Sequence, residues 1–124
     1  MKKLSQWLVG LLVVQFVLGM FANAYSTIPA DKPYEVFRQV GFIAPHAING
    51  VLLLILAIVF VVKAYKQKQQ LATAWGGLAG ILIAFTAGEL FVFTQNDAWS
   101  IVMALAFLGA FARYLVATKE LPNN

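Results

Sequence analysis

Apolar residues in this chain are gathered into four long runs that short polar segments separate. The runs cover about residues 4–24, 44–62, 75–94 and 98–117, each close to the ~20 residues that a bilayer-spanning helix needs. They lack period-two alternation and are too long for strands, which argues against a β-barrel. We therefore predict an all-α fold, an integral membrane four-helix up-and-down bundle that forms a single membrane domain over residues 1–124.

The longest polar connection, between the first two runs, contains the signals of a short helix. Asp31 can cap a helix that has Pro33 in its first turn. Tyr34, Phe37 and Val40 would then share one face. This pattern favours a short interfacial helix that lies in the headgroup plane between the first two membrane helices.

Composition indicates that lipid is the solvent for much of the surface. Of the 124 residues, 61% are hydrophobic and 11% charged, and the mean hydropathy is +0.79. Soluble domains average about 45–50% apolar and about 25% charged residues, and so small a body cannot bury such an apolar excess. The absence of cysteine excludes thiol catalysis and thiolate metal sites. Phosphate-loop, dinucleotide, nucleophile-elbow and zinc-ligand motifs are also absent, so enzymatic activity is not favoured.

Basic residues flank the apolar runs, so the net charge of +4 indicates contacts with membrane lipids and not with nucleic acid. The two chain ends and the segment 63–70 hold seven of the nine Lys and Arg residues. The other two connections hold only Lys32 and Arg38. By the positive-inside rule, both termini and the middle connection are expected in the cytoplasm.

The first run also permits a second interpretation, as a signal peptide cleaved after Ala24. A basic start, an apolar core and the A-x-A sequence at 22–24 fit this interpretation. Against it, the apolar core is longer than usual, and Gln15, Gly19 and Asn23 recur every four residues. We therefore favour a retained first helix.

Glu89 is the strongest single candidate for chemistry in the membrane, because polar residues there are costly and commonly functional. It lies about six residues, or roughly 9 Å, from the outer end of the third run, and its side chain is expected to tilt deeper. A carboxyl in this place is suited to binding a proton or a cation. The structural alternative is a protonated or hydrogen-bonded glutamate that joins helices.

His46 is the only histidine, and Pro45 places it in the first turn of the second helix. The helix dipole there favours a neutral ring, which is able to ligate haem b iron, hold a quinone carbonyl or pair with Glu89. A haem would need Met20 or Met103 as the second metal ligand, or a site shared by two chains. The structural alternative is an interfacial histidine exposed to headgroups and water.

Five polar residues are expected at similar depths in the bilayer. They are Asn23, His46, Asn49 and Glu89 in the outer half, and Gln15 nearer the middle. Such a set is typical of a ligand pocket or of an interhelical hydrogen-bond cluster. The sequence leaves both interpretations open.

Small residues recur every four positions in the third run, at Gly76, Gly80, Ala84 and Gly88. This spacing predicts a helix face that packs closely on another helix. A partner helix in the same chain is favoured over one in a second copy, and both remain open.

The segments Gln15-Phe16-Val17-Leu18-Gly19 and His46-Ala47-Ile48-Asn49-Gly50 resemble those of a family of small four-helix bacterial membrane proteins. In that family a Q-F-x-x-G segment ends helix 1 and an H-A-x-x-G segment opens helix 2. The resemblance covers the first half of the chain. It implies the bacterial inner membrane and a role for His46 in fold or function, but no particular activity.

Three classes of function follow. The preferred hypothesis is a non-enzymatic binding or accessory module, with lipids and a homodimer or a larger membrane complex as its partners. The second is a haem- or quinone-binding electron carrier that uses His46, and the third is a small proton-coupled transporter that uses Glu89.

Overall fold

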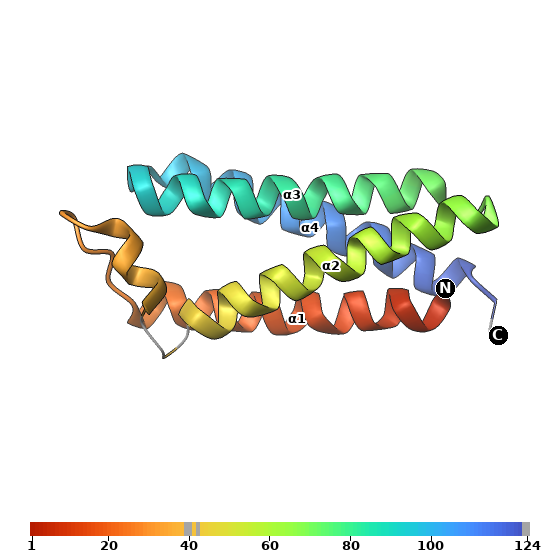
Figure 1. The fold of residues 1–124 in the computed structure, drawn as a ribbon, viewed down its shortest axis with the longest axis horizontal. Helices are drawn as coiled ribbons and strands as arrows, with labels where there is room; N and C mark the ends of the chain where they lie inside the picture. Colours follow the sequence, from red (N-terminus) through yellow and green to blue (C-terminus); the bar gives the residue numbers. More distant parts are fainter. Residues whose placement is uncertain (39–40, 42, 123–124) are drawn as a thin grey trace.

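The structure is a computed structural model that describes residues 1–38, 41 and 43–122. It is 87% helical, which confirms the predicted all-α four-helix bundle (Figure 1). All four long helices are long and apolar enough to cross a membrane, so the protein is a multi-pass membrane protein. The helices are α1 (Lys2–Tyr25), α2 (Ile43–Gln67), α3 (Leu71–Thr94) and α4 (Asp97–Glu120).

Figure 1 shows the two ends of the bundle. Both termini and the α2–α3 turn lie at one end, which we call the terminal end. The segment between α1 and α2 and the α3–α4 turn lie at the opposite end, which we call the loop end. Contacts from Gly88 with Met103 to Gly77 with Tyr114 pack α3 against α4. In Figure 1, α2 crosses obliquely from α1 at the loop end to α3 at the terminal end.

The apolar core occupies the terminal half of the bundle. Leu8 and Leu12 of α1 pack there with Phe60 of α2 and Tyr114 of α4, and all four are at most 1% exposed. The Phe60 and Tyr114 rings meet edge to face, with centroids 5.4 Å apart. Because lipid tails are as apolar as these side chains, the core stabilises the bundle through close van der Waals packing.

The α2–α3 turn is shorter than the apolar runs indicate. α2 continues to Gln67 and α3 begins at Leu71, whereas the runs predict a connection from 63 to 74. Hydropathy marks where the membrane ends, but Lys and Gln are good helix formers, so the helix extends past that point. Lys68 and Gln70 make the turn in the left-handed region, with φ of 52° and 57°.

The α3–α4 turn is built from two polar residues, Gln95 and Asn96. Gln95 ends α3 in the left-handed region, with a φ of 53°. Asn96 then caps α4, because its Oδ1 accepts a hydrogen bond from the backbone N–H of Ala98 at 3.0 Å. The turn therefore reverses the chain tightly and leaves α3 and α4 antiparallel.

We expect Asn96→Ala to lower the free energy of unfolding by about 1 kcal/mol, because the substitution leaves the Ala98 N–H without its capping oxygen. Asn96→Asp should retain most of the stability, since a carboxylate oxygen accepts the same bond. Unfolding in mixed detergent micelles, followed by circular dichroism, measures both. Equal unfolding midpoints for the Ala variant and the native chain would contradict the capping role.

The expected short helix is present as the 3-10 helix η1 (Pro33–Arg38). With three residues per turn, Tyr34 and Phe37 lie on the same side, and they are 54% and 41% exposed. Val36 points the other way and is fully buried, where η1 contacts α2 and α3. Val40, the third residue of the predicted face, lies outside the described residues.

Candidate functional site

Three of the five polar candidates meet between α1 and α2 in the loop half of the bundle. We call Gln15, His46 and Asn49 the polar cluster. Asn49 Nδ2 donates to Gln15 Oε1 at 2.7 Å and to the backbone carbonyl of Leu11 at 3.0 Å. Gln15 Nε2 lies 3.3 Å from His46 Nε2. Asn49 is only 8% exposed, so its amide is removed from lipid.

The Leu11 carbonyl determines which groups donate and which accept in these hydrogen bonds. A carbonyl only accepts, so the Asn49 group beside it is the amide nitrogen, and the Gln15 atom beside that nitrogen is the amide oxygen. Gln15 then offers its own amide nitrogen to His46. Because an amide nitrogen only donates, His46 Nε2 accepts, and the neutral ring carries its proton on Nδ1.

Two glycines border the polar cluster, and Gly19 makes room for the His46 ring. A Cβ atom at Gly19 would lie 3.1 Å from His46 Cε1 and 3.4 Å from His46 Nδ1. A Cβ atom at Gly50 would lie 3.4 Å from Gln15 Nε2. The absence of a side chain at Gly19 therefore lets the His46 ring lie close against α1, whereas the contact at Gly50 is an ordinary van der Waals distance.

Asn23 and Glu89, the other two polar candidates, do not join the polar cluster. Both are exposed, Asn23 near the loop end of α1 and Glu89 on α3. His46 points toward Gly19 of α1, so its ring does not make the pair with Glu89 that the sequence permitted.

The surroundings of His46 do not fit a haem. An iron ligand needs a bare nitrogen with open space before it. Nε2 accepts from Gln15, while Nδ1 is buried beside Gly19 and has no hydrogen-bond partner among the described residues. The two candidate second ligands point elsewhere: Met20 is 58% exposed on α1, and the sulfur of Met103 lies beside Gly88 of α3.

The row of small residues in α3 packs on α4 of the same chain. This row consists of Gly76, Gly80, Ala84 and Gly88. A Cβ atom at Gly80 would lie 2.9 Å from the Ala106 carbonyl oxygen, and one at Gly88 would lie 3.3 Å from the Met103 sulfur. Ala84, between these positions, is half-buried. These contacts bring the two backbones close together.

Gly76 at the terminal end of this row lies beside Arg113. A Cβ atom there would be 3.0 Å from the Arg113 Cζ, and Arg113 Nη1 donates to the Ala72 carbonyl at 3.3 Å. The guanidinium therefore lies across the first turn of α3.

Sequence reasoning missed Gly77, although a Cβ atom there would meet a closer neighbour than one at Gly76, Gly80 or Gly88. It would overlap the Tyr114 ring, at 2.6 Å from Tyr114 Oη, and that ring is fully buried. The available signal was the Gly76-Gly77 pair, and the four-residue spacing selects only Gly76 from it.

A second missed contact joins α1 and α4 at the terminal end. Ser5 is fully buried, and its hydroxyl donates to the Lys2 carbonyl at 2.8 Å. Thr118 Oγ1 lies 3.1 Å from Ser5 Oγ. A serine and a threonine in apolar runs are too common to predict such a pair.

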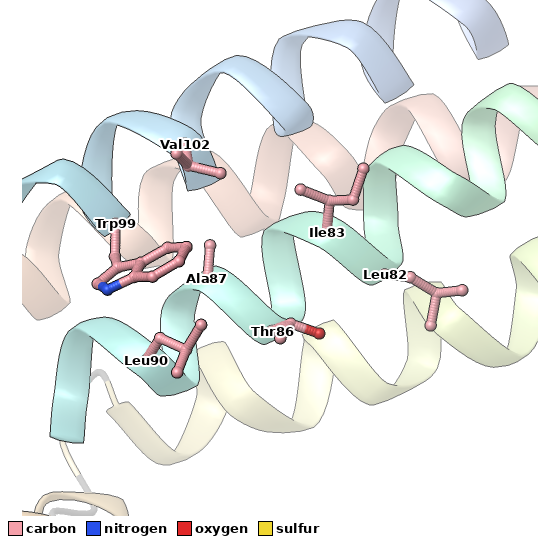
Figure 2. A pocket seen from close by; sticks show the side chains of 7 residues that line it. All are labelled: Leu82, Ile83, Thr86, Ala87, Leu90, Trp99 and Val102. Atoms are coloured by element: carbon pink, nitrogen blue, oxygen red, sulfur yellow. The ribbon is translucent and has the colours of Figure 1, made fainter. Parts of the chain in front are cut away.

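A shallow groove between α3 and α4 lies in the loop half of the bundle (Figure 2). Its volume is about 250 Å³. Apart from the Thr86 hydroxyl its lining side chains are apolar or aromatic, and Figure 2 shows the Trp99 ring extending from α4 toward Ala87 and Leu90 of α3. The groove is lined by Leu82, Ile83, Thr86, Ala87, Leu90, Trp99 and Val102.

Comparisons with protein-family models, with curated proteins and with solved structures give no match for this chain.

Proposed function

We propose that this protein is a non-enzymatic binding or accessory module of the membrane. The observation that carries the proposal is the direction in which its membrane-embedded polar groups point. The side chains of Gln15 and Asn49 form a hydrogen bond between α1 and α2. His46 forms a hydrogen bond with the Gln15 amide. Glu89, in contrast, lies on an exposed face. The interior polar groups hold helices together, and the exposed surface is left for binding.

We further propose that the protein lies in the bacterial inner membrane with its terminal end in the cytoplasm. Seven of its nine Lys and Arg residues are in the chain ends and the segment 63–70, and positive charges concentrate on the cytoplasmic side. Trp7 and Trp75, at the terminal end, are 68% and 58% exposed. Indole rings favour the headgroup level, which supports this placement.

The geometry gives less support to the two alternatives. A haem or quinone carrier needs an accessible nitrogen on His46, and both ring nitrogens face α1. A proton path through the bundle needs a carboxyl in its interior, and Glu89 is exposed.

We expect the protein, purified in mild detergent from haem-replete cells, to show no Soret band in oxidised or dithionite-reduced spectra. The reason is that Gln15 and Gly19 cover the two nitrogens of His46. Quinone extracted from the same sample should be equal for the native chain and for His46→Ala. Absorption spectroscopy and lipid extraction with mass spectrometry make these measurements.

The matched control in this experiment is Asn23→Ala, which changes an exposed polar residue outside the polar cluster. A Soret band or a stoichiometric quinone that disappears in His46→Ala and persists in Asn23→Ala would overturn the proposed function. It would make the electron carrier the better hypothesis.

A further inference from the structure

The face of α3 turned away from the bundle exposes a carboxyl group within the membrane span. Glu89 is exposed and lies five residues from Thr94, the last residue of α3. The 24 residues of α3 extend about 36 Å, roughly 6 Å more than the hydrocarbon core. Centred in that core, α3 places Glu89 about 4 Å inside the hydrocarbon, with its side chain tilted deeper. Carboxyls at such a depth almost always have a partner.

Glu89 belongs to a continuous row of exposed residues along α3, which we call the α3 seam. Its members alternate between spacings of four and three, the pattern by which helices pair in left-handed crossings. The glycines that contact α4 lie on other faces of the helix, so the four-helix bundle leaves this row uncovered. The α3 seam consists of Trp75, Ala79, Leu82, Thr86, Glu89 and Phe93.

The charge distribution determines how two copies of the chain would meet. Seven of the nine basic residues belong to the terminal end, so all copies in one membrane have the same orientation. Two α3 seams therefore meet as parallel helices, with equivalent residues at equal depth. Glu89 of one copy then lies at the level of Glu89 of the other.

A carboxyl is complementary to a second carboxyl when the two share a proton. A protonated carboxyl donates one hydrogen bond and still accepts others, so two carboxyls at equal depth can bond to each other. Thr86, one turn deeper, adds a hydroxyl in the direction in which the Glu89 side chain tilts. Lipid tails offer neither a donor nor an acceptor, and Ala79 leaves room for the helices to approach.

We propose that the α3 seam binds a second copy of this chain in a parallel dimer, with the two Glu89 carboxyls hydrogen-bonded to each other. This inference rests on the proposed binding function and names its partner. The groove beside the seam shares Leu82 and Thr86 with it, so a helix seated on the seam also covers part of that hollow.

Disulfide cross-linking tests the proposal directly, because the chain has no cysteine. The purified protein is reconstituted at a low protein-to-lipid ratio with single cysteines at Leu82 or, as the matched control, at Ile55. Each of these residues lies twelve positions from the loop end of its helix, and they are 44% and 52% exposed. We expect mild oxidation to convert Leu82→Cys to a dimer and to leave Ile55→Cys monomeric.

A second pair of variants tests Glu89 itself in the Leu82→Cys background. Glu89→Gln keeps a donor and an acceptor and should retain the cross-link. Glu89→Leu should reduce dimer formation about fivefold, the scale of one interhelical polar contact. Both variants should keep the helical circular dichroism of the native chain, because the Glu89 side chain is exposed.

Equal cross-linking at Leu82 and Ile55 would overturn the proposal, since it would show random collision. The absence of a Leu82→Cys dimer, or a dimer insensitive to Glu89→Leu, would overturn it too. A cross-link in whole membranes to a different chain, with no dimer in proteoliposomes, would reject a second copy as the partner. These failures leave the proposed binding function intact, whereas a His46-dependent Soret band would reject that function whether or not the dimer forms.

Discussion

Gly77→Ala should destabilise the bundle by about 2 kcal/mol. The new methyl group would overlap the Tyr114 ring, at 2.6 Å from Tyr114 Oη, well inside van der Waals contact. Tyr114 is fully buried and packs edge to face on Phe60, so the ring has little room to move away. Overpacking of this kind costs about 1–3 kcal/mol, and the higher helix propensity of alanine offsets up to about 1 kcal/mol. Unfolding in mixed micelles measures the difference.

Gly109→Ala is the matched control, because it makes the same chemical change in the adjacent helix. Apart from its chain neighbours and the adjacent backbone of α4, no described atom lies within 4 Å of a Cβ placed at Gly109, so this variant should be at least as stable as the native chain. The double variant Gly77→Ala, Tyr114→Leu should lose less stability than the sum of its single changes, since a shorter side chain relieves the clash. A Gly77→Ala protein as stable as Gly109→Ala would show that the ring is not confined.

Gln15→Leu should lower the free energy of unfolding by about 1–2 kcal/mol. Leucine is close in size to glutamine, so packing changes little while both amide hydrogen bonds are lost. Asn49 Nδ2 then keeps only the Leu11 carbonyl, and His46 Nε2 has no donor. Measured interhelical polar contacts in membranes average below 1 kcal/mol. Gln15→Leu removes two such contacts, so its expected cost in stability lies above that average.

The control for Gln15→Leu is Asn23→Leu, which removes an exposed amide from the same helix. Asn23→Leu should leave the unfolding midpoint within measurement error of the native value. A double-mutant cycle of Gln15→Leu with Asn49→Leu should also give a coupling energy of about 1 kcal/mol, because the two amides bond directly. Purely additive effects would mean that the 2.7 Å contact adds no stability.

The four helices could be predicted from the sequence because lipid imposes a single strong requirement. A span must be about 20 apolar residues long, and no other secondary structure satisfies its backbone inside the hydrocarbon. The ends of α2 and α3 could not be predicted in the same way. The polar residues from Lys63 to Gln70 are read as a loop by hydropathy, yet water and headgroups permit a helix there as readily as a turn.

The sequence predicts how deep each candidate residue lies in the membrane, but it does not predict the direction in which the side chain points. The position of a residue along its helix gives its depth, and depth alone groups Glu89 with His46 and Asn49. Whether side chains meet depends on rotation about the helix axis and on which helices are neighbours. Here α2 lies beside α1 at the loop end (Figure 1), so His46 meets Gln15 while Glu89 lies on an exposed face.

The oblique path of α2 also has a consequence for biogenesis. At the loop end, the hydrogen bonds of the polar cluster join α1 to α2, and among the described residues they use only groups of these two helices. The glycine contacts join α3 to α4 in the same independent way. The first hairpin can therefore satisfy its amides as soon as it enters the bilayer, before the ribosome has completed the second. We therefore expect assembly to proceed by docking of the two hairpins, in which Phe60 of the first meets Tyr114 of the second.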